Sequence, residues 1–319
     1  MRKIIILALV LLFSCEKVVE LNIPSHQPRL VVNGILDTDS IPSIFVSYSS
    51  GAFEQTEISC VLDANILLYE DGLLLGEMTI NPNEVDTFII TEDNWWNQIN
   101  SQSIYYYQLN TYPSVGSTYS IDVTHNDYAS VSATTSIPEN LELVDFNIVD
   151  NSNNSETMIY NATFNLTFND NPSQKNYYRI RLFLHTVVHE YEEADEFTEK
   201  SYPLILYSND PSLSQGIPWD GYTFSGRTAL FSDDLFNGEQ KSISFDMEYK
   251  LSGIEYGDSL FLQVTSFSED GYKYFNSLER NRDRFISPFG TEPVPVYSNV
   301  NNGIGIFAGG NSIYLPLLP

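Results

Sequence analysis

The sequence predicts an all-β protein of two tandem β-sandwich domains, immunoglobulin- or fibronectin-like, with one short helix near the C-terminus. Three observations predict this class. Aromatic residues make up 13% of the chain, which favours half-buried pleated surfaces over helices. Short β-type runs recur along the sequence and are separated by turn residues. The length of 319 residues exceeds the roughly 100 to 200 residues of one typical domain.

The first domain is predicted over residues 25–139. Apolar and polar residues alternate most clearly in Thr118–Thr124, as in a half-buried strand. Turn residues at Glu70–Gly72 and His125–Asp127 predict two hairpins, and Pro138 predicts the end of strand pairing. Seven or so strands at this spacing are typical of an immunoglobulin-like sandwich. The expected strands are Arg29–Leu36, Ser43–Ser49, Ala64–Glu70, Leu73–Ile80, Ile104–Tyr112, Thr118–Thr124 and Tyr128–Thr135.

The second domain is predicted over residues 140–319 and has longer loops. One of them, Glu190–Glu199, carries six acidic residues in ten and is expected to be a solvated excursion. The expected strands are Leu141–Val149, Met158–Phe168, Tyr177–Val188, Pro203–Tyr207, Ser242–Tyr249 and Ser259–Phe267.

One helix is expected over Gly271–Arg284. Tyr274 and Leu278 stand at the i,i+4 spacing of one helix face, and Ser268 or Asp270 is placed to cap the helix. We expect this helix to cover a sheet edge or one end of a sandwich.

The amino terminus predicts an exported, lipid-anchored protein. Two basic residues and the apolar stretch Ile4–Leu12 have the layout of a signal peptide, predicted over residues 1–14. The stretch is shorter than the roughly 20 residues that span a bilayer. Leu12–Cys15 resembles a bacterial lipobox, which predicts diacylglycerol on Cys15 and a lipidated tether over residues 15–24. The alternative is an ordinary signal peptide followed by an unrelated cysteine.

The formal charge of −27 excludes nucleic acid as a partner. The charge is uneven, since no Lys or Arg occurs between Leu30 and Gln174. A protein with this negative charge would attract basic partners or divalent cations. Simple solubility of a secreted protein explains the same composition.

Several segments carry a family resemblance. They are Cys15–Leu21, Pro28–Ile35, Asn176–Arg179, Asp270–Tyr274 and, most closely, Glu292–Gly309. Together they resemble a family of Bacteroidota lipoproteins filed as domain of unknown function 4249. The resemblance implies an envelope lipoprotein that assists a TonB-dependent outer-membrane receptor in nutrient uptake.

The expected function is therefore that of a binding or docking accessory to a TonB-dependent transporter at the outer membrane. The alternative is a structural or adhesive envelope lipoprotein without a transporter partner. In the related bacteria, acidic residues after the lipidated cysteine are linked to display on the cell surface. Only Glu16 precedes Lys17 here, so the cell surface and the periplasmic leaflet both stay open.

The closing segment Glu292–Gly309 can also be interpreted physically. Val296–Ser298 predicts a short strand, and Asn301–Gly303 a turn that needs a positive φ. Ile304–Phe307 then predicts a returning strand, in which Gly305 allows close backbone approach. The expected result is a hairpin that closes the second sandwich, with a ligand or receptor contact as the alternative.

Calcium is the one cofactor that the loops suggest. Asp37 and Asp39, the loop Asn169–Asn171, and Asp233 and Asp234 are clusters of the oxygen ligands that calcium prefers. None of them matches an EF-hand. Asx-rich turns give the same residue pattern without any metal.

A second candidate site is aromatic. Trp95 and Trp96 lie in the same aromatic-rich region as Tyr105–Tyr107. Consecutive residues on a strand face opposite sides, so Trp95, Trp96 and Tyr106 are candidates for stacking on a sugar or peptide. Core packing with one solvent-facing ring is the alternative.

Catalytic patterns are lacking in the sequence. There is no Gly-x-Ser-x-Gly, and His185 and His189 lie in a run with strand character. Four residues along a strand separate positions by about 13 Å, too far apart for one zinc ion. The sequence therefore predicts a protein that is not an enzyme.

Overall fold

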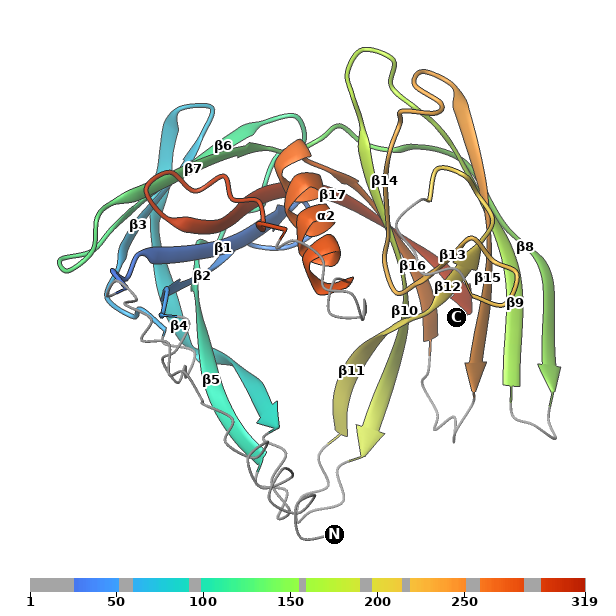
Figure 1. Ribbon diagram of the computed structural model, residues 1–319, viewed down its shortest axis with the longest axis horizontal. Helices are drawn as coiled ribbons and strands as arrows, with labels where there is room; N and C mark the ends of the chain where they lie inside the picture. The colour runs from blue at the N-terminus through green and yellow to red at the C-terminus, as the bar shows by residue number, and fades with distance from the viewer. Residues whose placement is uncertain are drawn as a thin grey trace, which may run out of the picture.

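The computed structural model describes residues 26–51, 60–91, 99–154, 159–189, 197–213, 219–250, 259–283 and 294–318. The predicted all-β class is confirmed, with sandwich-like sheets and a helix near the C-terminus. Figure 1 shows the strands arranged as two halves with helix α2 between them.

The larger sheet has twelve strands in the order β11-β10-β16-β17-β1-β2-β5-β4-β3-β6-β7, and β14 pairs with β10 beside this path. The strands in chain order are β1 Leu30–Asp37, β2 Ser43–Tyr48, β3 Asn65–Glu70, β4 Leu73–Thr91, β5 Ile99–Gln108, β6 Thr118–Thr124, β7 Val131–Ser136, β10 Tyr177–His189, β11 Phe197–Leu204, β14 Ala229–Ser232, β16 Ser259–Phe267 and β17 Ile304–Leu318.

The smaller sheet has five strands in the order β13-β12-β15-β9-β8. They are β8 Glu142–Asn154, β9 Ile159–Asn169, β12 Leu206–Ser208, β13 Phe224–Gly226 and β15 Gln240–Lys250. Strand β9 shows full alternation of buried and half-buried residues, as the period of two requires for a sheet with one covered face.

Two main hydrophobic cores hold the layers together. In the first half, β1, β2 and β5 pack against β3, β6 and β7 around Tyr119 and Ile66, both fully buried. In the second half, the smaller sheet packs against β10, β16 and β17 around Phe164 and Phe245, whose ring centroids are 5.6 Å apart. The predicted boundary at residue 139 falls in the linker between β7 and β8, while the larger sheet runs through both halves.

Several short-range predictions hold in the first half, but two predicted strands extend too far: β5 ends at Gln108 instead of Tyr112, and β7 begins at Val131 instead of Tyr128. Strand β6 buries alternate residues, and β3 and β4 form the expected hairpin. Its turn residues Asp71 and Gly72 have φ values of 49° and 78°, as a tight two-residue hairpin turn requires. Strands β6 and β7 pair antiparallel across the second predicted turn.

Helix α2 (Glu269–Asp283) begins two residues before the predicted start, and Ser268 caps it as expected. The Ser268 Oγ accepts hydrogen bonds from the backbone N–H of Gly271, at 3.3 Å, and of Gly309 in β17, at 3.1 Å. The Tyr272 ring stacks on Tyr177 of β10, with centroids 4.7 Å apart. Ser268 therefore fixes the start of α2 against β17.

The predicted solvated loop Glu190–Glu199 lies mostly outside the described residues. Its last three residues, Phe197–Glu199, belong to β11, where they pair with Val187–His189 of β10. For these three residues the loop prediction is wrong, because the neighbouring strand supplies partners for their backbone groups.

The closing segment differs from its prediction in two ways. Val296–Ser298 is not a strand, because side chains take its backbone partners: the Tyr297 N–H donates to Ser277 Oγ of α2 at 2.8 Å. The strand after the turn does not close a hairpin. Instead, β17 pairs parallel with β1 and antiparallel with β16. The predicted turn is confirmed, with Asn302 at a φ of 61°.

The predicted close approach at Gly305 is confirmed. Its φ is 117°, and a Cβ atom there would collide with the carbonyl oxygen of Val32 in β1. At Gly309, a Cβ atom would collide with the carbonyl oxygen of Ser136 in β7. These two glycines allow β17 to lie close to the backbones of the first half.

Candidate functional site

A cavity of about 650 Å³ lies at the junction of the two halves. We call it the junction cavity. Its walls come from the linker between β7 and β8, from the loop between β9 and β10, and from the start of α2. The lining residues that carry its chemistry are Glu139, Asn140, Glu142, Asp170, Lys175 and Glu269.

The linker wall is fixed by β17. The Asn311 side chain donates to the carbonyl oxygen of Pro138, at 3.2 Å, and to Asn140 Oδ1, at 2.9 Å. The Thr38 hydroxyl donates to Asn311 Oδ1 at 2.9 Å. The buried Asn311 thus ties together β17, the end of β1 and the linker, so this wall is held in place by the larger sheet.

The loop wall is organised by Asp170, which is buried. Its carboxylate accepts hydrogen bonds from the Tyr178 hydroxyl at 2.5 Å, the Gly238 N–H at 2.7 Å and the Asn176 side chain at 3.1 Å. Burial raises the pKa of Tyr178, and the bond to Asp170 raises it further. This wall is a hydrogen-bonded frame that keeps the loop between β9 and β10 rigid.

Asn176 joins a second carboxylate to this frame. Its backbone N–H donates to Asp233 Oδ2 at 2.7 Å, and burial raises the pKa of Asp233. Next to it, Lys175 Nζ lies 2.6 Å from Asp234 Oδ1, and this hydrogen bond lowers the pKa of Asp234. The structure therefore brings together two clusters that the sequence analysis named separately, Asn169–Asn171 and the Asp233–Asp234 pair.

The other predicted acidic pair lies elsewhere, where β1 ends. Asp37 is buried and accepts hydrogen bonds from the Ser312 hydroxyl, at 2.6 Å, and the Ser312 N–H, at 3.1 Å. Burial raises the pKa of Asp37. Asp39 is exposed and hydrogen-bonds Tyr314. Burial raises the pKa of the Tyr314 phenol, and this hydrogen bond raises it further.

These contacts bear on the calcium prediction. In both places the buried carboxylate oxygens accept hydrogen bonds from protein donors, as Asx-rich loops do without a metal. Within the described ranges, no group of three or more His, Cys, Asp or Glu residues is placed to hold a metal ion. Calcium binding at these loops stays a prediction, and the measurement is the melting temperature in chelator and in millimolar calcium.

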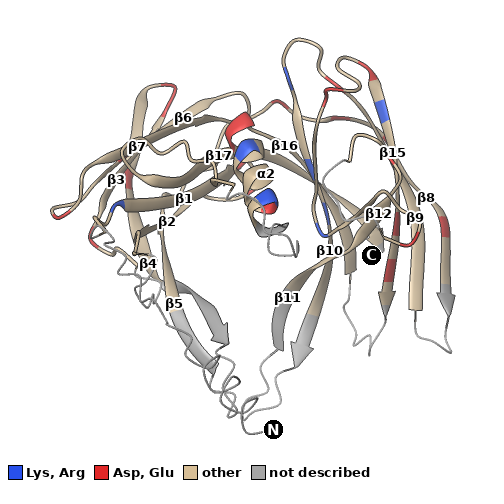
Figure 2. Ribbon diagram, in the orientation of Figure 1, with Lys and Arg blue, Asp and Glu red and all other residues tan. Residues whose placement is uncertain are grey.

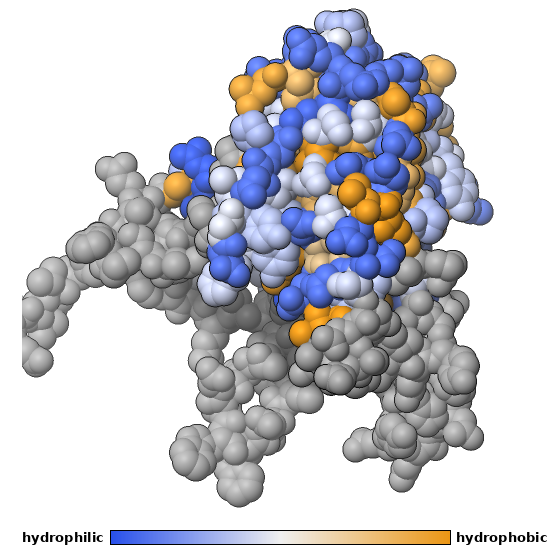
Figure 3. Space-filling model, turned by 90° about the vertical axis from the view of Figure 1, so that its right-hand side faces the viewer, coloured by the Kyte–Doolittle hydropathy of each residue, from blue (hydrophilic) through white to orange (hydrophobic). Residues whose placement is uncertain are grey.

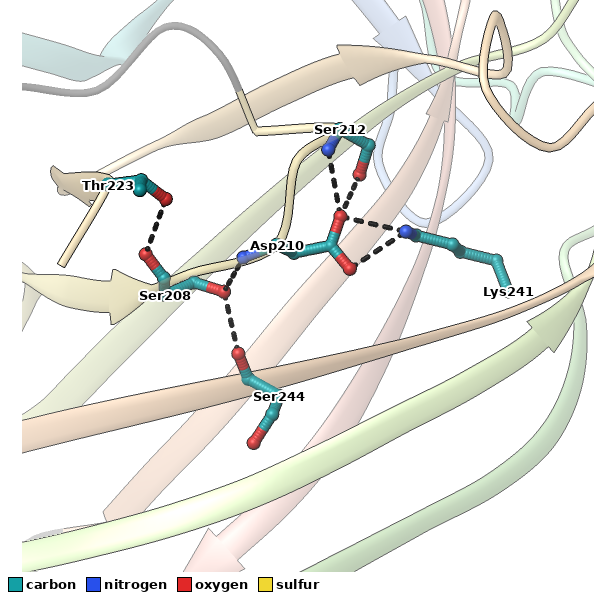
Figure 4. Close-up of polar contacts among 6 residues, drawn as sticks. All are labelled: Ser208, Asp210, Ser212, Thr223, Lys241 and Ser244. Atoms are coloured by element: carbon teal, nitrogen blue, oxygen red, sulfur yellow. Dashed lines mark hydrogen bonds and ion pairs between the residues drawn. The ribbon is translucent and has the colours of Figure 1, made fainter.

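Asp210 and Lys241 belong to a polar cluster on the smaller sheet and its loops (Figure 4). Lys241 Nζ lies 2.7 and 2.8 Å from the two Asp210 oxygens, and Asp210 also accepts from the Ser212 hydroxyl. Lys241 Nζ lies 5.2 Å from the centroid of the Phe236 ring, which in turn packs on Tyr178. The cluster therefore supports the tyrosine that hydrogen-bonds Asp170.

Charge around the junction cavity is mostly negative. Figure 2 shows where Lys, Arg, Asp and Glu lie among the described residues. The described lining holds the carboxylates of Glu139, Glu142, Asp170 and Glu269 and one cation, Lys175. The Glu269 carboxylate is 2.9 Å from Lys273 one helical turn on, and this hydrogen bond lowers the pKa of Glu269. A cavity between the two halves that is lined by polar donors and acceptors suits ligand or partner recognition.

Other predicted site residues lie apart from this cavity. Cys15, Trp95 and Trp96 lie outside the described residues. Tyr106 is on β5, half-buried, with its ring 6.3 Å from that of Phe45. Its neighbour Tyr107 is buried in the core and donates to the Val61 carbonyl at 3.0 Å, so Tyr106 and Tyr107 face opposite sides of β5.

The expectation of strand structure at the histidine pair is confirmed as well. His185 and His189 both lie on β10, four positions apart, and the His185 ring nitrogen lies 3.1 Å from the Ser201 hydroxyl of β11. The sequence analysis missed Lys175, Asn176 and Glu139 as cavity residues. All three stand in turn-rich segments between strands, and Asn176 also begins one of the segments that carry the family resemblance.

Residues 16–313 match the family described as Domain of unknown function (DUF4249). The chain belongs to this family. The DUF4249 match spans both halves, the junction cavity and most of β17. No protein with a curated description was found to be similar to the chain. Across the described segments, no helix has both the length and the apolar character to cross a membrane.

Proposed function

We propose that this DUF4249 protein is an outer-membrane lipoprotein, anchored through Cys15, that acts as a binding or docking accessory to a TonB-dependent transporter in nutrient uptake. The observation that carries the binding role is the junction cavity. Its walls are fixed by Asn311 and Asp170, and its lining offers polar groups with one cation. A preorganised cavity of this kind binds without losing much conformational freedom.

The anchor is supported by the amino-terminal sequence. The lipobox-like Leu12–Cys15 follows a short apolar stretch, and acyl chains contribute about 0.8 kcal/mol per buried CH₂. An anchored body diffuses in two dimensions beside membrane partners, which raises its effective concentration near them. Location and binding role thus support one another in the proposal.

A pull-down from the native membrane tests it. The tagged chain, extracted in mild detergent, is expected to recover a TonB-dependent receptor. The double variant Glu139→Gln/Lys175→Ala is expected to recover at least about tenfold less, if the junction cavity makes the contact. Glu77→Gln, on the exposed part of β4, is the control. Recovery of no such receptor, or equal recovery with the cavity variant, contradicts the proposal.

An adhesive role is the second candidate, and one feature favours it. The hairpin between β3 and β4 exposes Leu73 (74%), Leu74 (57%) and Leu75 (38%) in a row. Exposed apolar patches mark interaction sites. In this case Leu73→Ser/Leu74→Ser would abolish attachment of cells while the receptor pull-down stays negative.

A further inference from the structure

A second cavity, of about 460 Å³, lies on the outer face of the smaller sheet and shares no lining residue with the junction cavity. Figure 3 shows the molecule from the side of this sheet, where hydrophilic residues cover most of the described surface. We call this second cavity the outer cavity. None of the residues proposed as sites from the sequence lines it.

The floor of the outer cavity is built by strand register. Residues directly opposite one another form two rows across the sheet. On β9, β12 and β15 the neighbours of these residues along the strand, such as Ala162, Leu206 and Met247, are buried in the core. The first row is Tyr207, Asp246, Thr163 and Asp150, and the second is Glu248, Asn161 and Ser152.

The wall is aromatic and rigid. Trp219 and Tyr222 exchange backbone hydrogen bonds of 2.9 and 3.1 Å across a tight turn. The Tyr222 ring packs on Tyr207, with centroids 5.2 Å apart, and its hydroxyl hydrogen-bonds Asp246, which raises the pKa of Tyr222. Trp219 beside them leaves 64% of its surface exposed. A large ring held open to solvent at a cavity edge is a ready stacking surface.

The charge of the outer cavity indicates which class of ligand it can bind. Four carboxylates line it, from Asp150, Asp220, Asp246 and Glu248, and no Lys or Arg is among its described lining residues. Strands lie about 4.8 Å apart and alternate residues about 7 Å apart, so the floor carboxylates are spread out instead of converging as around a metal ion. Carboxylates beside an aromatic face attract an organic cation by both charge and cation–π contact.

We propose that the outer cavity binds an organic cation, an alkylammonium or guanidinium group that stacks on Trp219 and pairs with Glu248. The group comes either from a free polyamine or from a Lys or Arg side chain of a peptide. A neutral sugar would also stack on Trp219, but it would leave four carboxylates without a counter-charge. This site is independent of the proposed transporter role.

Calorimetric titration of the purified full chain tests the site at about 0.15 M ionic strength, where general attraction is screened. The probes are spermidine, the peptide acetyl-Lys-Gly-Lys-amide and neutral maltotriose. Trp219→Ala and Glu248→Gln are each expected to raise the Kd for the cation by about tenfold. Asp145→Asn, an exposed carboxylate on β8 outside the cavity, is expected to leave the Kd within about twofold.

The outcomes separate the alternatives. Binding of spermidine without the peptide identifies a free cation, and binding of the peptide alone identifies a basic partner. Equal weakening by Asp145→Asn, a preference for maltotriose, or no heat with millimolar spermidine and peptide overturns the proposal. Unchanged melting temperatures of the variants establish that a lost signal reports the site and not the fold.

Discussion

At the residue scale, Asp210 depends on its counter-ion Lys241. Each side chain is 13% exposed, so both charges are largely removed from water. Burial alone would raise the pKa of Asp210, but hydrogen bonds from Lys241 and Ser212 outweigh it and the pKa is lowered. The stability that this carboxylate contributes is therefore present above the unfolded-state pKa and is lost as pH falls through the folded-state pKa.

Lys241→Met is expected to lower the free energy of unfolding by about 3 kcal/mol at neutral pH, because it leaves a buried carboxylate without its counter-ion. At acidic pH the protonated Asp210 no longer needs that partner, so the loss shrinks. Urea denaturation at both pH values measures the difference. The control Asp210→Asn/Lys241→Met removes both charges and is expected to be milder. An equal loss at both pH values contradicts the electrostatic account.

At the scale of elements, β17 depends on the absence of a side chain at Gly305. Gly305→Ala is expected to cost about 3 kcal/mol or more, since it adds both a positive-φ penalty and a collision with Val32 of β1. Gly72→Ala is the matched control: its φ is 78°, but nothing lies within 4 Å of the added Cβ. Thermal denaturation compares the two. A similar loss of stability in both variants would mean that the positive φ, and not the collision with Val32, causes the destabilisation.

Elements with local signals were predictable from the sequence. The alternation in Thr118–Thr124 and the cap at Ser268 each act within a few residues. The partner of β17 was not predictable, because nothing in Ile304–Phe307 specifies a strand at the other end of the chain. The same holds for the site. The sequence placed Asp170 and Asp233 in separate loops, and only the tertiary structure shows that Asn176 hydrogen-bonds both of them.

At the scale of the whole molecule, the two halves share a strand. Phe307 and Val300 belong to the core of the first half, although they follow the last strands of the second half in sequence. A fragment of residues 25–139 therefore lacks both side chains and the parallel neighbour of β1. Exposure of that strand edge and loss of the core aromatic ring each destabilise it.

We expect this fragment to show no cooperative unfolding transition in urea, followed by circular dichroism, whereas the chain from residue 25 to 319 does. Adding a peptide of residues 294–318 is expected to restore part of the transition. A fragment that unfolds cooperatively by itself would instead establish the first half as an independent domain, as the sequence analysis expected.

Because β17 lies between β1 and β16, the order of synthesis matters to this protein. The strand that completes the first-half core follows the other strands of its sheet in the sequence, so we expect the first half of a growing chain to stay incomplete until Ile304–Leu318 has been made. We therefore expect a chain truncated before residue 304 to leave the facing edges of β1 and β16 unpaired and to be degraded more readily than the full chain.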